Sequence, residues 1–206
     1  MTWARRGAVG LGGLLVGGAL GAFVVPARQG TPTDGSADVR FVRDMSAHHA
    51  QAVDMSVILL KRAHDPAVKL LAQDIALTQQ AQIGQMSGWL TAWHLPVAGP
   101  RPPMFGMDRT AMGMATPAEV RTLESLPVPE AESRFLLLMR RHHLGGVAMA
   151  RNVLPEARQP LVQAFARRVV ASQTAEVRSI DAMLEDRQIA PPAGAEVTGM
   201  EHLDHH

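Results

Sequence analysis

The sequence of 206 residues contains no cysteine and no tyrosine, and only 4% of its residues are aromatic. The absence of cysteine excludes disulfide bonds, thiolate metal sites, a cysteine nucleophile and a lipoprotein anchor. The formal net charge is only +1, so no strong field attracts nucleic acid or strongly acidic partners. A chain that is 47% hydrophobic, with Leu, Val, Ala and Met in place of aromatic residues, favours helices over a sheet.

The first 27 residues have the pattern of an export segment. Arg5 and Arg6 form a basic start, residues 7–25 are an uncharged apolar run, and Ala27 offers a small residue for cleavage. An uncleaved membrane anchor through residues 7–25 is the alternative, because about 19 apolar residues approach the length of a membrane span. Both interpretations predict that the rest of the chain lies outside the cytoplasm, in the periplasm, on the cell surface or secreted.

A motif with two adjacent histidines occurs twice. Residues 41–55 read FVRDMSAHHAQAVDM and residues 135–149 read FLLLMRRHHLGGVAM, so that Phe, both Met, both His and Val recur at a constant offset of 94. The ungapped segments 41–90 and 135–184 share 14 identities, which indicates an internal duplication.

The motif has the spacing of an amphipathic helix. Phe41, Met45, His48, Ala52 and Met55 follow one another at intervals of four, three, four and three residues, which places them on one helix face. The second histidine of each doublet lies about 100° further round the helix. We therefore expect one histidine of each doublet in the apolar seam, and the other at a second site or facing solvent.

The pattern predicts an all-α chain, with a ferritin-like four-helix bundle made of two duplicated helical hairpins and a long Met-rich crossover. The long helices are expected at about 38–63, 66–93, 130–154 and 160–187, and a capping box at Thr116 and Glu119 should open a short helix to about Ser125. A crossover of this length sets the first long helix against the third. The predicted parts are a linker (28–37), a bundle domain (38–188) of repeat 1 (38–94), Met-rich linker (95–128) and repeat 2 (129–188), and a disordered His-containing tail (189–206).

Twelve side chains are candidate metal ligands. Imidazole is a borderline ligand and thioether a soft one, so their combination without cysteine favours copper as Cu(I) or Cu(II), with zinc or iron as alternatives. The candidates are His48, His49, His142, His143, Met45, Met55, Met139 and Met149 in the two motifs and Met104, Met107, Met112 and Met114 in the linker. The competing interpretations are hydrogen-bonded core histidines, methionines that fill the core, and a linker packed on the bundle. The tail histidines are a further weak site, or have no role.

Carboxylate chemistry has little support. Ferritin-like di-iron sites need Glu and Glu-x-x-His on facing helices. Here Asp44 corresponds to Leu138 in the second copy, and Glu176 corresponds to Gln82 in the first. Because this carboxylate set is incomplete, the sequence does not predict an oxidase or ferroxidase.

The doubled motif with its Met-rich connection resembles the domain-of-unknown-function family 305 over about residues 38–187. That resemblance implies a ferritin-like bundle in an exported bacterial protein, and some members look like extracytoplasmic copper binders tied to copper tolerance. The family's motif positions fall on the two histidine doublets with their flanking methionines, and its linker methionines fall on the four named above. The second copy has Gly145 and Gly146 where the first has Gln51 and Ala52, which is a familiar variant.

The leading hypothesis is a non-enzymatic, exported protein that binds copper and sequesters it or passes it on. Its partners would be metal ions, with no nucleic acid and with no protein partner that the sequence identifies. One competing hypothesis is a redox enzyme whose histidines hold a metal with an open coordination position. The other is a metal-free envelope protein whose bundle docks a partner.

Overall fold

The computed structural model describes residues 30–190. This part of the chain has no strand and has five helices, which are α1 (Ala37–Leu60), α2 (Pro66–Ala92), α3 (Pro117–Ser125), α4 (Val128–Val153) and α5 (Pro160–Asp186). The all-α prediction is confirmed. The predicted export segment 1–27 and nearly all of the predicted tail 189–206 lie outside the described residues. Among the helices that are described, none combines the length and the apolar character needed to cross a membrane.

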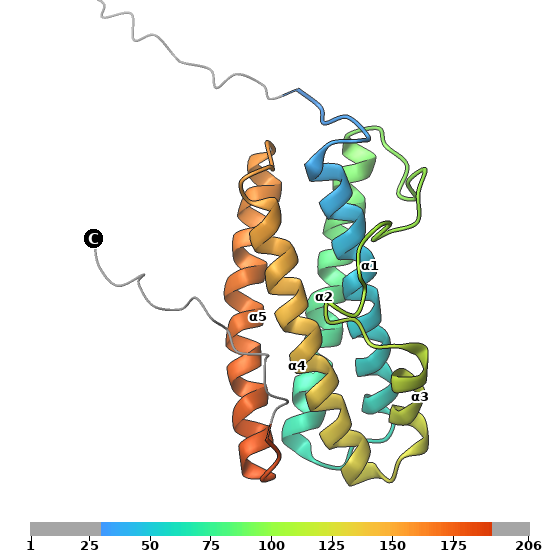
Figure 1. The fold of residues 1–206 in the computed structure, drawn as a ribbon, viewed down its shortest axis with the longest axis vertical. Helices are drawn as coiled ribbons and strands as arrows, with labels where there is room; N and C mark the ends of the chain where they lie inside the picture. Colours follow the sequence, from blue (N-terminus) through green and yellow to red (C-terminus); the bar gives the residue numbers. More distant parts are fainter. Residues whose placement is uncertain (1–29, 191–206) are drawn as a thin grey trace, which may run out of the picture.

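The four long helices form one bundle (Figure 1). α1 pairs with α2 and α4 pairs with α5, each through a short connection, and the two hairpins meet where α1 packs against α4. α3 is short and lies against α4 and α1. The predicted contact between the first and third long helices is therefore confirmed as the α1–α4 interface.

α1, α2 and α3 begin within a residue of the predicted starts, because side chains satisfy free amides of their first turns. α4 and α5 have no side-chain cap, and α4 begins at Val128, two residues before the predicted start. The hydroxyl of Ser36 accepts a hydrogen bond from the amide of Val39 (3.3 Å), and Asp65 caps α2 directly before a proline. The capping box is present: the hydroxyl of Thr116 accepts from the amide of Glu119 (3.2 Å), whose carboxylate accepts from the amide of Thr116 (2.8 Å).

Two buried carboxylates lock the hairpins to each other. Asp38, in the first turn of α1, accepts hydrogen bonds from the amides of Gln159 (2.9 Å) and the residue before it, at the start of α5. Glu132, near the start of α4, accepts from the amides of Asp65 (2.8 Å) and the residue before it, at the start of α2. Both the carboxylates and their partners are related by the offset of 94, so the contact is reciprocal. This arrangement fits the pseudo-twofold relation that the duplication suggests.

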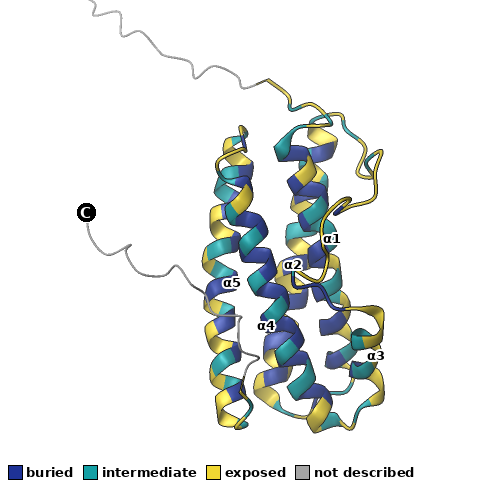
Figure 2. Cartoon of the chain, in the orientation of Figure 1, coloured by how far each residue is buried: buried dark blue, intermediate teal, exposed yellow. Residues whose placement is uncertain are grey.

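The core is divided into two apolar clusters along the bundle (Figure 2). One contains Met55 and Met139 with Phe135, and the other contains Met45 and Met149 with side chains from α2 and α5. The four motif histidines fall between these clusters in sequence, on α1 and on α4, and all four are buried. We call these four side chains, His48, His49, His142 and His143, the imidazole layer.

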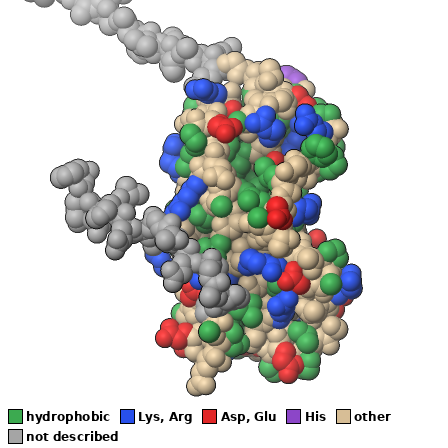
Figure 3. Space-filling view, viewed as in Figure 1, with side chains coloured by type: hydrophobic (Ala, Val, Ile, Leu, Met, Phe, Trp, Pro, Cys, Tyr) green, Lys and Arg blue, Asp and Glu red, His purple; other side chains and the backbone are tan. Residues whose placement is uncertain are grey.

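The linker leaves the end of α2, runs along the outside of α1 and reaches α3 (Figure 1). Basic, acidic and apolar side chains are interspersed on the face that carries the linker, and histidine shows only at its upper edge (Figure 3). None of the four side chains of the imidazole layer has exposed surface.

Candidate metal centre

The inner part of the imidazole layer is a pair of stacked rings. His48 of α1 and His142 of α4 are fully buried, and their ring centroids lie 3.7 Å apart at an interplanar angle of 31°. The helices bring them together because equal positions of the duplicated motif meet at the α1–α4 contact. The prediction that one histidine of each copy lies in the apolar seam is confirmed by this pair.

The outer histidines are each held by the partner helix of their own hairpin. His49 Nε2 donates a hydrogen bond to the side-chain oxygen of Gln82 on α2 (2.7 Å), and His143 Nε2 contacts a carboxylate oxygen of Glu176 on α5 (2.5 Å). Gln82 and Glu176 are related by the offset of 94. The second histidine of each doublet is fully buried, so the alternative in which it faces solvent is wrong.

Several ring nitrogens in this layer lack a partner. Within the described residues, no hydrogen bond reaches Nδ1 of His48, His49 or His143, or either ring nitrogen of His142. The amides of Gln79 and Gln173, which are again related by the offset of 94, also carry unpartnered buried atoms. Buried polar groups are normally satisfied, so a concentration of unsatisfied nitrogens indicates a place that can accept a ligand. The orphaned atoms fit a metal ion that imidazole nitrogens can bind.

The surroundings of His48, His49 and His142 keep these three rings neutral. Burial lowers the pKa of His48 to about 4, and burial together with the neighbouring imidazole lowers the pKa of His49 to about 3. Burial likewise holds the pKa of His142 well below its ordinary value. Metal ligation requires the neutral imidazole, so these rings are in the ligating state at neutral pH without having to lose a proton.

The linker methionines divide into two groups. Met104 and Met114 are each only 3% exposed and pack into the apolar core. Met107 is 44% exposed and Met112 is half-buried, and both line a groove of about 260 Å³ together with Met149 of α4. The packing interpretation therefore describes two of the four, and the other two share a surface site with a methionine of the second motif.

We call this hollow the methionine groove. It lies between α1, α4 and the linker, and Asp44 and Phe105 also line it. Asp44 accepts a hydrogen bond from the amide of Met104 (2.6 Å), and burial raises the pKa of its carboxyl group. The groove thus places thioether sulfurs, the ligands that a soft cation prefers, beside an oxygen ligand that can carry negative charge.

The remaining motif methionines are core residues. Met45, Met55 and Met139 have no exposed surface and lie inside the two apolar clusters. Within the described residues, no three side chains of His, Asp or Glu gather closely enough to hold a metal ion. Within this part of the chain, the groove with its thioethers is therefore the candidate site that is already assembled.

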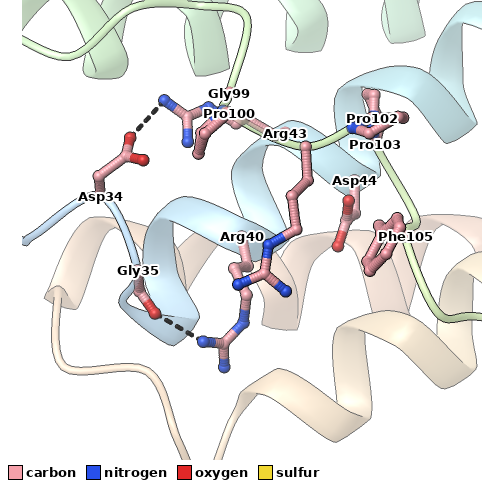
Figure 4. A pocket seen from close by; sticks show the side chains of 11 residues that line it. Asp34, Gly35, Arg40, Arg43, Asp44, Gly99, Pro100, Pro102, Pro103 and Phe105 are labelled. Carbon is pink, nitrogen blue, oxygen red and sulfur yellow. Dashed lines mark hydrogen bonds and ion pairs between the residues drawn. The ribbon is translucent and has the colours of Figure 1, made fainter.

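A second hollow, of about 370 Å³, adjoins the methionine groove, because Asp44 and Phe105 line both. Figure 4 shows the residues that line this second hollow. Here the guanidinium of Arg43 donates hydrogen bonds to Asp34 and to the carbonyl oxygen of Pro96, both at 2.7 Å. These bonds tie the segment before α1 and the beginning of the linker to the first turns of α1. Arg43 therefore holds together the segments that line this hollow.

The linker residues 112–115, which we call the strap, cover the inner histidine pair. His48 Nε2 donates a hydrogen bond to the carbonyl oxygen of Met112 (3.0 Å). Gln51 holds the strap through two bonds, from its side-chain nitrogen to the Ala115 carbonyl (2.8 Å) and from the Ala115 amide to its side-chain oxygen (2.7 Å). A side chain at Gly145 would collide with the carbonyl group of Met112, so the strap requires glycine at that position of α4.

The strap also explains where the two copies of the motif differ. Gln51 of the first copy binds the strap, and its counterpart Gly145 makes room for it. Gly146 lies against the buried amide of Gln173, where a Cβ atom would also collide. In the sequence these substitutions are a variant of the motif, and only the structure gives their cause. A comparison of the polar positions at the offset of 94 would have indicated Gln51 and the Gln82–Glu176 pair as candidate residues of the site.

The fold and the site define a class: an all-α bundle with a buried imidazole layer and a methionine-lined groove beside it. The family model described as "Domain of unknown function (DUF305)" matches residues 38–184, and the chain belongs to this family. A solved DUF305 structure from Streptomyces coelicolor, described as a secreted protein, is 42% identical with a TM-score of 0.72, covering 78% of this chain and 99% of that one. A DUF305 fragment from Deinococcus radiodurans is 41% identical with a TM-score of 0.66, covering 73% of this chain and 96% of that one.

Solved structures of the protein CopM are similar at lower identity. CopM in the Cu(I)-bound form is 26% identical with a TM-score of 0.55, covering 73% of this chain and 96% of that chain. CopM has also been solved in Ag-bound, Cu(II)-bound and apo forms. Among curated proteins, an uncharacterized protein of Acanthamoeba polyphaga mimivirus is 38% identical over 53 residues, which are 26% of this chain and 35% of that protein. The match therefore spans about a third of that relative's length.

Proposed function

We propose that this chain is an exported copper-binding protein that takes up Cu(I) in the methionine groove and sequesters it or passes it on. The observation that carries the proposal is the meeting of Met107, Met112 and Met149, from two distant parts of the sequence, in one solvent-open hollow. Three thioethers are a soft ligand set, which selects Cu(I) over zinc or iron. The copper- and silver-bound forms of CopM support the same chemistry in a similar fold.

The imidazole layer supplies a second set of ligands behind the groove. The rings of His48, His49 and His142 are neutral and some nitrogens of the layer have no partner, so the layer suits either oxidation state of copper. We propose binding without turnover, because the carboxylates that a ferritin-like oxidase needs are replaced by Gln82, Leu138 and Ala148 at the corresponding positions. Export rests on the basic and apolar pattern of residues 1–27, and on the likeness to the protein from Streptomyces coelicolor that is described as secreted.

A competition titration with a Cu(I) chelator tests the groove. Changing Met107, Met112 and Met149 together to Leu keeps apolar bulk but removes every thioether that lines the hollow. Loss of an outer-shell partner alone costs a metal site about 10- to 100-fold in affinity, so loss of these ligands should cost more than 100-fold.

The matched control changes Met104 and Met114 to Leu, since these two linker methionines are buried in the core. This variant should keep the affinity of the unaltered chain, with a similar melting temperature. If the control lost Cu(I) as completely as the groove variant did, or if the groove variant kept its full affinity, the groove would not be the copper site.

A further inference from the structure

We infer that the strap is a gate between the methionine groove and the His48–His142 pair, so that a soft cation held in the groove reaches the imidazoles only when residues 112–115 move. This inference rests on the proposed function, because it concerns the passage of the same metal ion. It adds a second binding site, the His48–His142 pair, and a barrier between that site and the methionine groove.

Met112 belongs both to the methionine groove and to the cover of the inner histidine pair. It lines the methionine groove beside Met107 and Met149, and its carbonyl oxygen accepts the hydrogen bond of His48 Nε2 at 3.0 Å. A metal ion bound through the Met112 thioether would therefore act on the residue whose main chain covers the inner pair. A movement of the Met112 side chain in the groove would therefore reach His48 through Met112 alone.

The strap lies over a pair that is closed to solvent, and few hydrogen bonds tie it to the helices. Both inner rings are 0% exposed. Within the linker, the amides of residues 112–114 donate backbone hydrogen bonds to carbonyl groups of residues 108–110, and these bonds can move together with the strap. Besides the bond from His48, the strap is tied to the helices by the two bonds to Gln51, by a long bond from Arg141 to the Met114 carbonyl (3.4 Å), and by the packing of its last two side chains in the core. Segments held by a small set of separable contacts open locally without unfolding of the whole protein.

An open strap would leave the His48–His142 pair ready to bind a soft cation. Movement of the strap frees His48 Nε2, while His48 Nδ1 and both nitrogens of His142 have no partner already. The rings come from α1 and α4, which are fixed by the bundle, so the ligands remain close when the cover moves. The groove thus captures the ion and the pair retains it.

Glycine positions offer a variant that opens the strap without touching a ligand. A Cβ atom at residue 145 would collide with the Met112 carbonyl, so Gly145→Ala should displace the strap while favouring the helix itself. Gly88→Ala is the matched control, because it places the same methyl group on a helix with nothing within 4 Å. Both variants are made in the full chain.

The first measurement needs no metal. Diethyl pyrocarbonate modifies accessible imidazoles, and mass spectrometry reports each site, with the exposed His64 and His94 as internal references. The inner histidines should react slowly in the unaltered chain and in Gly88→Ala. In Gly145→Ala they should react at least about tenfold faster, which is the effect of losing roughly one net hydrogen bond from the closed state. Equal rates in both glycine variants, with cooperative melting retained, would overturn the gate.

A second variant keeps the test decisive if Gly145→Ala does not fold. Gln51→Leu removes both bonds to Ala115 and leaves every candidate ligand in place, and Gln73→Leu on the exposed side of α2 is its control. The inner histidines should again react faster only in the first. Protection unchanged in Gln51→Leu would also contradict the proposal.

The metal experiment separates this inference from the proposed function. Stopped-flow binding of Ag(I), which needs no reductant, should show a fast phase that is lost when the groove methionines become Leu, and a slow phase that Gly145→Ala accelerates. If the unaltered chain bound no Ag(I), the proposed function would fail, whatever the labelling rates showed. If Ag(I) bound in one phase that the change of His48 and His142 to Leu left intact, the gate would fail and the groove would stand.

Discussion

Acid should unfold this bundle through its imidazole layer, well above the pH at which carboxylates titrate. The folded state holds His48, His49 and His142 neutral, with the pKa of His48 at about 4 and that of His49 at about 3. In the unfolded chain an imidazole has its ordinary pKa of about 6.5. Between these values the unfolded state binds more protons, so stability falls as the pH falls below about 6.5.

The magnitude follows from the pKa differences. At pH 5 each imidazole that remains neutral in the fold costs about 2 kcal/mol relative to pH 7.5, and the slope approaches 1.4 kcal/mol per pH unit for each ring. Three such rings remove about 6 kcal/mol, which is comparable with the whole stability of a typical domain, about 5–15 kcal/mol. The metal-free chain should therefore be largely unfolded, or close to it, at pH 5.

Carboxylates contribute little to the loss of stability expected as the pH falls from about 6.5 to about 4.5. Hydrogen bonds from Arg141 hold the pKa of Glu119 at about 2, so the stability that this pair contributes is lost only as the pH falls below about 4.5. Asp44 has a raised pKa because of burial, and its protonation opposes acid unfolding. The interval between pH 4.5 and 6.5 thus reports mainly on the histidines.

Urea unfolding followed by circular dichroism, in chelator, at several pH values between 7.5 and 5 measures the effect. His49→Gln should lower the slope of unfolding free energy against pH by about 1.4 kcal/mol per unit, because one neutral ring is gone. His94→Gln, which changes an exposed ring, should leave the slope unaltered. A free energy of unfolding that stayed constant from pH 7.5 to pH 5 would refute the neutral imidazoles on which the proposed inner site depends.

Two further predictions concern the hairpin lock and export. Asp38→Ala leaves two part-buried amides at the start of α5 without their carboxylate acceptor and should lower the free energy of unfolding by about 3 kcal/mol, measured in urea. Asp74→Ala on the exposed face of α2 is the control, and a loss below about 1 kcal/mol in Asp38→Ala would contradict the lock. Fractionation of cells that make the full chain should place it outside the cytoplasm, and replacement of Arg5 and Arg6 by Glu should retain it inside; a chain found in the cytosol from the start would contradict export.

The helices and their pairing could be predicted because local and periodic signals specify them. Ser36, Asp65 and the Thr116–Glu119 box mark helix starts, and each signal acts within a few residues. The doubled motif placed equal faces of α1 and α4 together, since a duplication that builds one core must meet itself. His48 and His142 are the direct outcome of that rule.

The path of the linker could not be predicted in the same way. Its position depends on bonds between residues about 60 apart in sequence, such as Asp44 with Met104 and Gln51 with Ala115, and irregular backbone has no period that reveals them. For this reason the four linker methionines had equal standing in the sequence, although Met104 and Met114 are buried in the core. Met149 had been assigned to the helical motif, and only the tertiary fold joins it to the linker.

The duplication and the linker together explain why the proposed metal site is one-sided. Two identical hairpins would offer two equal faces, but one linker can cover only one of them. Each α1 side chain that binds it is polar, and the counterparts in α4 lack that group or that contact. The pairs are Arg43 with Leu137, Asp44 with Leu138, Gln51 with Gly145, and His48, which binds Met112, with His142, whose nitrogens are unpartnered. The symmetric part of the sequence therefore builds a buried pair of equivalent imidazoles, and the asymmetric part decides from which side, and past which residue, an ion can reach them.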